Sequence, residues 1–167
     1  VTYSDESADT YLLPVREVSA VVDPTSLLLD LTYASGTTGF LIDALHDRST
    51  AIALLEFIAA GSQSAGAKGT MRGVPTQVFA EVRGTDVLEP VLWRRGGSNS
   101  SIAFGDRLML KVFRRPNRGI NPDWELGRYL TEEAHFPHAP RTAGAIEYLD
   151  DEGYTRTLGL LQELVAN

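Results

Sequence analysis

The 167-residue sequence contains no cysteine, which excludes disulfide bonds, zinc–thiolate sites and thiol catalysis. No apolar run approaches the roughly 20 residues that a membrane-spanning helix needs. The N-terminus lacks the basic stretch followed by an apolar one that marks a signal peptide. These absences predict a cytoplasmic protein. The formal net charge of −7 also argues against non-specific nucleic-acid binding, which needs a basic face.

Positive charge comes almost entirely from arginine, because the chain has only two lysines, Lys68 and Lys111. Residues 1–88 carry five basic and eleven acidic groups, whereas 89–167 carry ten and eleven. Between positions 94 and 118, seven basic residues accompany a single acid. This segment suits a phosphorylated small ligand, or it is an ordinary solvated basic hairpin.

The first 88 residues read as a small α+β unit of short elements, which we interpret as an antiparallel-sheet cap subdomain. Its expected strands are 10–22, 26–34 and 39–44. Asp47 can cap a helix whose apolar positions recur at helical spacing. The Gly/Ser/Ala-rich stretch 61–69 predicts a loop, and a short helix is expected over 77–83. No chemistry is assigned to this part, whose acidic surface suits a lid or interaction role.

From residue 89 to 167 the pattern predicts an antiparallel sheet with one helix. The expected strands are 87–93, 101–104, 107–113, 142–149 and 155–161. Asn121 and Pro122 supply the cap and first-turn proline of the helix. The expected buried stripe of this helix consists of Leu126, Tyr129 and Leu130. Glu125 borders that stripe, so we expect it to point inward.

Lys111 is the most informative residue because it places a lone ammonium inside the apolar strand 108–113. A charge in a half-buried strand destabilises the fold unless it is paired or holds a ligand. Side chains alternate along a strand, so Lys111 shares a face with Met109. A Gly/Ser-rich turn over 96–101 precedes the strand, and Glu125 follows Lys111 near the start of the predicted helix.

A glycine-rich hairpin, a strand lysine and a helix glutamate follow one another in this order in the nucleotide-binding lobe of kinases. In such a lobe Lys111 would reach the ATP phosphates, Glu125 would orient it, and Met109 would cover the adenine. Glycine lets backbone N–H groups approach phosphate oxygens closely. The alternatives are a structural ion pair, a lysine reaching water from a strand edge, and an ordinary hairpin turn.

Several segments resemble bacterial maltokinases, which are relatives of aminoglycoside phosphotransferases and are often fused behind trehalose synthase. The segments are GSNSS at 97–101, FGDRLMLKVFRR at 104–115, GINPDWELGRYL at 119–130 and LQELVAN at 161–167. Residues 11–14 and 43–45 resemble the N-terminal cap subdomain of that family. The Gly-Glu-Gln-Ser-Asn that is usual in the family appears here as RGGSN at 95–99, which departs at three positions.

The resemblance implies transfer of the γ-phosphate of ATP to the anomeric hydroxyl of maltose, giving maltose 1-phosphate. It also implies that residues 89–167 form a protein-kinase-like N-lobe, with one C-type helix, that ends at the hinge. Lys111 would bind the phosphates and Glu125 would orient it. Ser98, Asn99, Ser100 and Ser101 would close over the phosphates. The hinge backbone of Gln162, Glu163, Leu164 and Val165 would meet the adenine.

A kinase also needs a catalytic aspartate with a nearby asparagine, and a second aspartate that holds Mg²⁺. None is recognisable, since none of the three histidines begins a His-x-Asp pattern. We therefore expect the base, the Mg²⁺ ligands and the sugar site to belong to an absent C-lobe, and this fragment alone to be inactive. No catalytic residue and no metal site is predicted within the chain.

Two other functions stay open at this point. The parent protein could phosphorylate another sugar, such as glucosamine, because the acceptor contacts would lie in the absent lobe. Alternatively, the chain is a non-catalytic interaction module that retains a kinase-like half as scaffold. The expected partners of the parent kinase are ATP, maltose and a fused or associated trehalose synthase.

Overall fold

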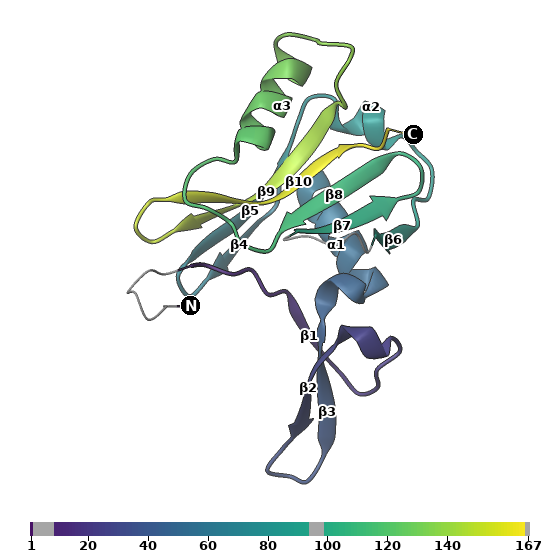
Figure 1. The fold of residues 1–167 in the computed structure, drawn as a ribbon, viewed down its shortest axis with the longest axis vertical. Coiled ribbons are helices and arrows are strands. Elements are labelled where there is room, and N and C mark those ends of the chain that lie inside the picture. Colours follow the sequence, from purple (N-terminus) through teal and green to yellow (C-terminus); the bar gives the residue numbers. More distant parts are fainter. Residues whose placement is uncertain (2–8, 94–98, 166–167) are drawn as a thin grey trace.

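The computed structural model describes residues 1, 9–93 and 99–165. Within these residues the chain forms two antiparallel sheets and three α-helices (Figure 1), which confirms the predicted α+β class. None of the helices in the described ranges is long and apolar enough to cross a membrane.

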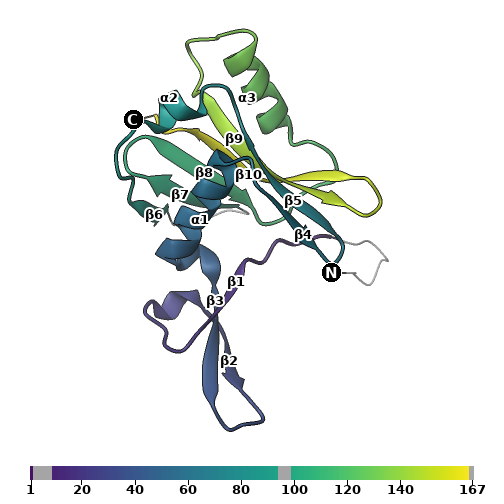
Figure 2. The ribbon, with the colours of Figure 1, turned by 180° about the vertical axis from the view of Figure 1, so that it is seen from behind.

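The smaller sheet has three strands and projects from the rest of the fold (Figure 1, Figure 2). Its strands are Val15–Val18 (β1), Leu27–Thr32 (β2) and Thr38–Asp43 (β3), in the order β1-β3-β2. A 3₁₀ turn at Pro24–Ser26 (η1) precedes β2, and another at Ala44–His46 (η2) follows β3. The sequence had predicted these strands in the same order, the first two with longer boundaries and the third shifted by one residue.

The larger sheet has seven strands in the order β4-β5-β9-β10-β8-β7-β6. They are Gln63–Gly66 (β4), Gly69–Pro75 (β5), Pro90–Trp93 (β6), Asn99–Phe104 (β7), Leu108–Phe113 (β8), Thr142–Asp150 (β9) and Thr155–Glu163 (β10). All neighbouring pairs are antiparallel. The sheet therefore joins strands from both sides of the predicted boundary between residues 88 and 89.

The prediction of a loop over 61–69 is wrong, because most of that stretch belongs to the β4–β5 hairpin. Gly66 pairs with Gly69 across a two-residue turn, and Gly69 has a φ of 150° that favours glycine. β5 then pairs with β9 along its whole length. The strand forms because β9 offers a long partner edge, which composition alone does not reveal.

Two helices cover opposite faces of the larger sheet. Arg48–Ala59 (α1) begins at Asp47, whose side chain accepts a hydrogen bond from the Thr50 N–H as the capping signal predicted. It crosses the face seen in Figure 2, and Pro122–Glu132 (α3) lies against the opposite face. A short helix at Phe79–Arg83 (α2) lies near β9.

The core follows the alternation of β8. Leu108, Leu110 and Val112 join the main apolar cluster on the α1 side of the sheet. Phe113 instead joins a smaller cluster on the α3 side with Trp124 and residues of β9 and β10. Because successive strand residues point to opposite faces, Lys111 and Met109 share one face, as predicted. This face is the α3 side, where Phe113 also lies.

The predicted buried stripe of α3 is wrong. Leu126 and Tyr129 are 58% and 57% exposed, and the helix packs through Trp124 and Thr131. Gly127 lies directly against Thr142 of β9, where a larger residue would collide. The helix is thus rotated so that its smallest residue and its tryptophan meet the sheet, and Glu125 is exposed.

Candidate functional site

Lys111 lies in the middle of β8, between two other strands. Its paired neighbours are Ser101 of β7 and Leu160 of β10, and directly paired residues place their side chains on one face. The ammonium lies 5.3 Å from the centroid of the Phe113 ring, within the range of a cation–π contact. The lysine side chain is 34% exposed, so solvent reaches part of it.

The carboxylate bonded to this ammonium is that of Asp123. Lys111 Nζ donates to Asp123 Oδ2 over 3.1 Å, and the two side chains are 34% and 60% exposed. Asp123 belongs to the first turn of α3, where the Asn121 side chain accepts a hydrogen bond from its backbone N–H. Exposed pairs of this kind contribute only about 0–1 kcal/mol, so an anionic ligand can replace the aspartate.

Glu125 lies one half-turn further along α3. It lines a groove of about 290 Å³ along the helix, together with Arg128 and Tyr129. The sequence singled out Glu125 and missed Asp123, although both acids stand in the first helical turn. The role of Glu125 in orienting Lys111 stays a prediction.

Several predicted site residues share the face of Lys111. Met109 pairs with Gln162 on the β10 side, and Ser101 pairs with Lys111 itself. Asn99 pairs with Phe113 and so lies on the same face. All four are half-buried. On this side of the sheet α3 lies over β9, and no helix of the described segments covers β7 and β8 (Figure 1).

Ser100 points to the opposite face of the sheet. Residues 99–101 continue as strand β7, so Ser100 and Ser101 face in opposite directions. The Ser100 hydroxyl accepts a hydrogen bond from Arg114 Nε over 2.9 Å, on the side of the smaller sheet. Ser98, predicted to act with them, lies outside the described residues.

The predicted hinge residues follow the end of β10. The Glu163 N–H donates to the Arg141 carbonyl over 2.8 Å, and the Leu164 N–H donates to the Arg107 carbonyl over 2.7 Å. These two N–H groups are engaged within the fold, so an adenine would have to use other backbone groups of Gln162, Glu163, Leu164 and Val165.

Arg141 holds the end of β10 in place. Its guanidinium donates two hydrogen bonds to the Glu163 carboxylate, over 3.0 and 3.1 Å, and a third to Glu81 of α2. The hydrogen bonds from Arg141 lower the pKa of Glu163, and both carboxylates raise the pKa of Arg141. The Glu163 side chain therefore stabilises the strand end rather than offering a free carboxylate.

No model of a known protein family matches the sequence. Across the described ranges, no three acidic or histidine side chains gather closely enough to hold a metal ion. The candidate site thus consists of one half-exposed ammonium, a replaceable carboxylate and the polar and apolar side chains beside them. Chemically, this arrangement can bind an anion such as a phosphate next to a flat apolar group.

Proposed function

We propose that this chain is the cap and nucleotide-binding part of an ATP-dependent sugar kinase that converts maltose to maltose 1-phosphate. The observation that carries the proposal is the position of Lys111. Among the residues that the structure describes, no helix covers its face of β8 (Figure 1), and its one hydrogen-bond partner is an exposed acid in the first turn of α3.

The order of the neighbouring elements supports this proposal. A β7–β8 hairpin carries the lysine, α3 follows, and β9 and β10 complete the sheet beside β8. An antiparallel sheet with one helix after the lysine strand is what a kinase-like N-lobe requires, and its glycine-rich turn precedes the lysine. The resemblance to maltokinases places the same parts in the same order.

In this proposal the phosphates of ATP replace Asp123 as the partner of Lys111. Met109 and Gln162 lie two residues from Lys111 and Leu160 in adjacent strands, on the same face, and would border the adenine. Ser101 and Asn99 would lie beside the phosphates. The described residues do not fit a Mg²⁺ site, so Mg²⁺, the catalytic base and maltose are not assigned to residues of this chain.

A second candidate is a non-catalytic interaction module. The exposed apolar side chains of the smaller sheet favour it, since contiguous apolar patches mark binding surfaces. They include Leu27, Leu28 and Leu29 of β2. Association with a trehalose synthase, or phosphorylation of another sugar such as glucosamine, would be compatible with the same nucleotide face.

An ATP analogue with an acyl group on its terminal phosphate tests the proposal directly. A lysine amine near the phosphates attacks the acyl carbonyl, an amide forms, and ATP leaves. The chain has two lysines, so peptide mass spectrometry reads the reaction at each separately. Lys68, exposed in the β4–β5 turn, serves as the internal control.

We expect acylation of Lys111 that excess ATP suppresses, and acylation of Lys68 that ATP leaves unchanged. A Lys111→Ala variant should lose the ATP-protected signal, whereas Lys68→Ala should keep it. Equal labelling of both lysines, insensitive to ATP, would contradict nucleotide binding at this face. That result would favour the interaction module.

A further inference from the structure

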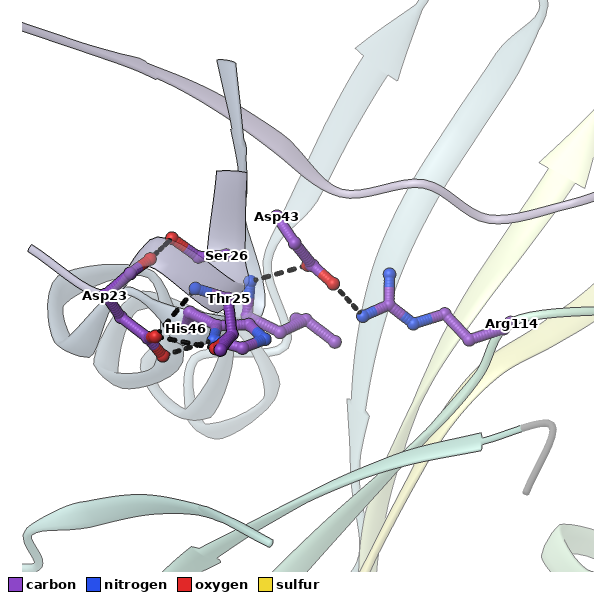
Figure 3. A network of polar contacts seen from close by, with 7 residues as sticks. Asp23, Thr25, Ser26, Asp43, His46 and Arg114 are labelled. Atoms are coloured by element: carbon purple, nitrogen blue, oxygen red, sulfur yellow. Dashed lines mark hydrogen bonds and ion pairs between the residues drawn. The ribbon is translucent and has the colours of Figure 1, made fainter. Parts of the chain in front are cut away.

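Arg114 connects the smaller sheet to the back of the candidate nucleotide face. It follows β8 directly, and its guanidinium forms an ion pair with Asp43 at the end of β3 (Figure 3). The same guanidinium donates to the Ser100 hydroxyl of β7 over 2.9 Å. The side chains of Arg114 and Asp43 are only 22% and 16% exposed, so water screens this link weakly.

Asp43 is itself held firmly in place. Its second carboxylate oxygen accepts the Leu45 N–H over 3.1 Å at the start of η2. In the same turn, His46 bonds to Asp23 over 3.0 Å, and Asp23 caps η1 through the Thr25 N–H (Figure 3). The acid therefore belongs to a network that joins η1, η2 and the base of the smaller sheet.

The backbone of Arg114 is also fixed from the N-terminal part of the chain. Its carbonyl accepts the Leu12 N–H over 2.8 Å, and the Ala44 N–H donates to the Pro14 carbonyl over 3.0 Å. Leu12, before β1, and Asp43, at the end of β3, thus hold Arg114 from two directions. A residue held in this way can set the position of the groups to which it donates.

Ser100 links Arg114 to strand β7, which also carries Ser101 on the opposite face of the sheet. It is bonded from behind by Arg114, while its neighbour Ser101 faces forward and pairs with Lys111. β7 pairs with β8 on one edge and with the short strand β6 on the other. A hydrogen bond at Ser100 therefore adds a tether close to the point where β7 faces the ammonium.

We propose that Asp43 and Arg114 are positioning residues of the nucleotide face, which act through Ser100 on the placement of β7 beside Lys111. This inference rests on the proposed function for its effect on ATP, but the tether itself does not. The smaller sheet is then a structural support of the site, although Arg114 meets Ser100 on the face opposite to Lys111. Neither Asp43 nor Arg114 needs to touch the nucleotide.

Two readouts on the full chain test the tether and its consequence separately. Hydrogen exchange of the β7 amides reports how firmly the strand is held in the sheet without any nucleotide. Protection of Lys111 from the acyl-phosphate analogue by ATP reports binding. The variants are Asp43→Asn, Arg114→Gln and Ser100→Ala, with the pair Asp43→Asn and Ser100→Ala also combined.

Arg16→Gln is the matched control. Arg16 lies in β1 and pairs with Asp47 at the start of α1, so its loss disturbs another contact of the smaller sheet without touching β7. Thermal unfolding of each variant identifies any that fail to fold. Ser100→Ala removes one hydroxyl only and keeps the test decisive if the charged variants unfold.

We expect faster exchange of the β7 amides in all three variants. The ATP concentration that half-protects Lys111 should rise about three- to tenfold, which is the effect of losing one charge-assisted hydrogen bond. The combined variant should need no more ATP for half-protection of Lys111 than Asp43→Asn alone, because both changes break the same chain of contacts. Arg16→Gln should leave both readouts unchanged.

If Ser100→Ala changes neither the exchange of the β7 amides nor the protection of Lys111 by ATP, the inference is overturned. The proposed function still stands in that case, provided that ATP protects Lys111 in the wild type. Faster exchange with no effect on ATP protection would likewise overturn the positioning role. If wild type shows no ATP protection, the proposed function fails, and the positioning role for ATP fails with it. The exchange result then still shows whether the tether to β7 exists.

Discussion

Lys111 donates a hydrogen bond to Asp123, whose side chain is 60% exposed, whereas the lysine side chain is 34% exposed and its ammonium also lies over the Phe113 ring. The lysine is therefore the fixed member of the pair and the aspartate the replaceable one. Glu125, two residues further along α3, is also exposed and lines the groove along this helix. The two acids should respond differently to neutralisation.

Asp123→Asn is expected to tighten ATP protection of Lys111 by about two- to fivefold, because it removes an exposed carboxylate that competes with phosphate. Glu125→Gln is expected to weaken protection if Glu125 orients the lysine in the nucleotide-bound state. The labelling assay with ATP competition measures both. A tenfold loss in Asp123→Asn would instead make Asp123 the orienting carboxylate.

Asp47 is expected to give α1 a stability that depends on pH. Burial raises the pKa of Asp47, but the hydrogen bonds from Ser49 and Thr50 outweigh this effect and lower the pKa to about 2. Its folded pKa therefore lies below the unfolded value of about 3.9. The ionised carboxylate stabilises the fold above the unfolded pKa, and this contribution is lost as the pH falls through about 2.

Asp47→Ala should accordingly lower the free energy of unfolding by about 1–2 kcal/mol at pH 7, the size of a lost helix cap. The difference from wild type should shrink between about pH 4 and the folded pKa. Urea unfolding at several pH values measures this. Asp30→Asn, an exposed carboxylate of β2, is the control, and a difference that stays constant down to low pH would contradict the assignment.

Glu147 of β9 is expected to be one of the most stabilising polar residues. Its side chain is 6% exposed, and it accepts hydrogen bonds from Trp124 Nε1 over 2.9 Å and from Arg72 Nε over 2.8 Å. Glu147→Ala leaves both donors without this partner and should destabilise the fold by about 3 kcal/mol.

Glu152→Ala is the matched comparison, since Glu152 pairs with Arg118 where both side chains are exposed. Its effect should stay below about 1 kcal/mol, as for other surface pairs. Chemical denaturation of both variants provides the measurement. Similar losses from the two substitutions would show that burial does not govern the Glu147 contribution.

Gly127 is expected to resist replacement by alanine, although alanine is the better helix former by about 1 kcal/mol. A Cβ at this position would lie well inside van der Waals contact with Thr142 Oγ1. Gly127→Ala should therefore destabilise the fold by about 1–3 kcal/mol through overpacking.

Thr142→Ala should recover much of that loss in the double variant, because it removes the atom with which the new methyl group collides. Thr142 Oγ1 has no hydrogen-bond partner in the described part of the chain, so its own removal costs little. Leu126→Ala, on the exposed side of the same helix, is the control and should change stability by less than about 0.5 kcal/mol. Strict additivity of the two substitutions would contradict the predicted collision.

Much of the fold could be predicted because its signals are local. Asp47 and Asn121 cap helices through contacts within three residues, and both helices begin where these caps predicted. The β7–β8 hairpin and the alternation of β8 follow from a period of two in neighbouring residues. The same alternation correctly placed Met109 and Lys111 on one face.

The candidate site could be predicted only in part. The sequence identified Lys111 by its chemistry, since a charge in an apolar strand stands out without any structure. It expected α3 to bury Leu126 and Tyr129, and that expectation failed because Trp124 and Gly127 fit β9 better. The rotation of α3 decides which acid meets the lysine, and rotation depends on packing against a distant strand.

By itself, the sequence determined the α+β class, the helix starts, the hairpin that carries Lys111 and the side chains that share a face with that lysine, because each depends on neighbours along the chain. Only the tertiary structure decided that Asp123 meets the ammonium, that β5 joins β9, and that Arg114 ties Asp43 to Ser100. These contacts join segments that are far apart in the sequence; Arg72 and Glu147, for example, are 75 residues apart. Their free energy depends on packing in three dimensions, about which local periodicity carries no information.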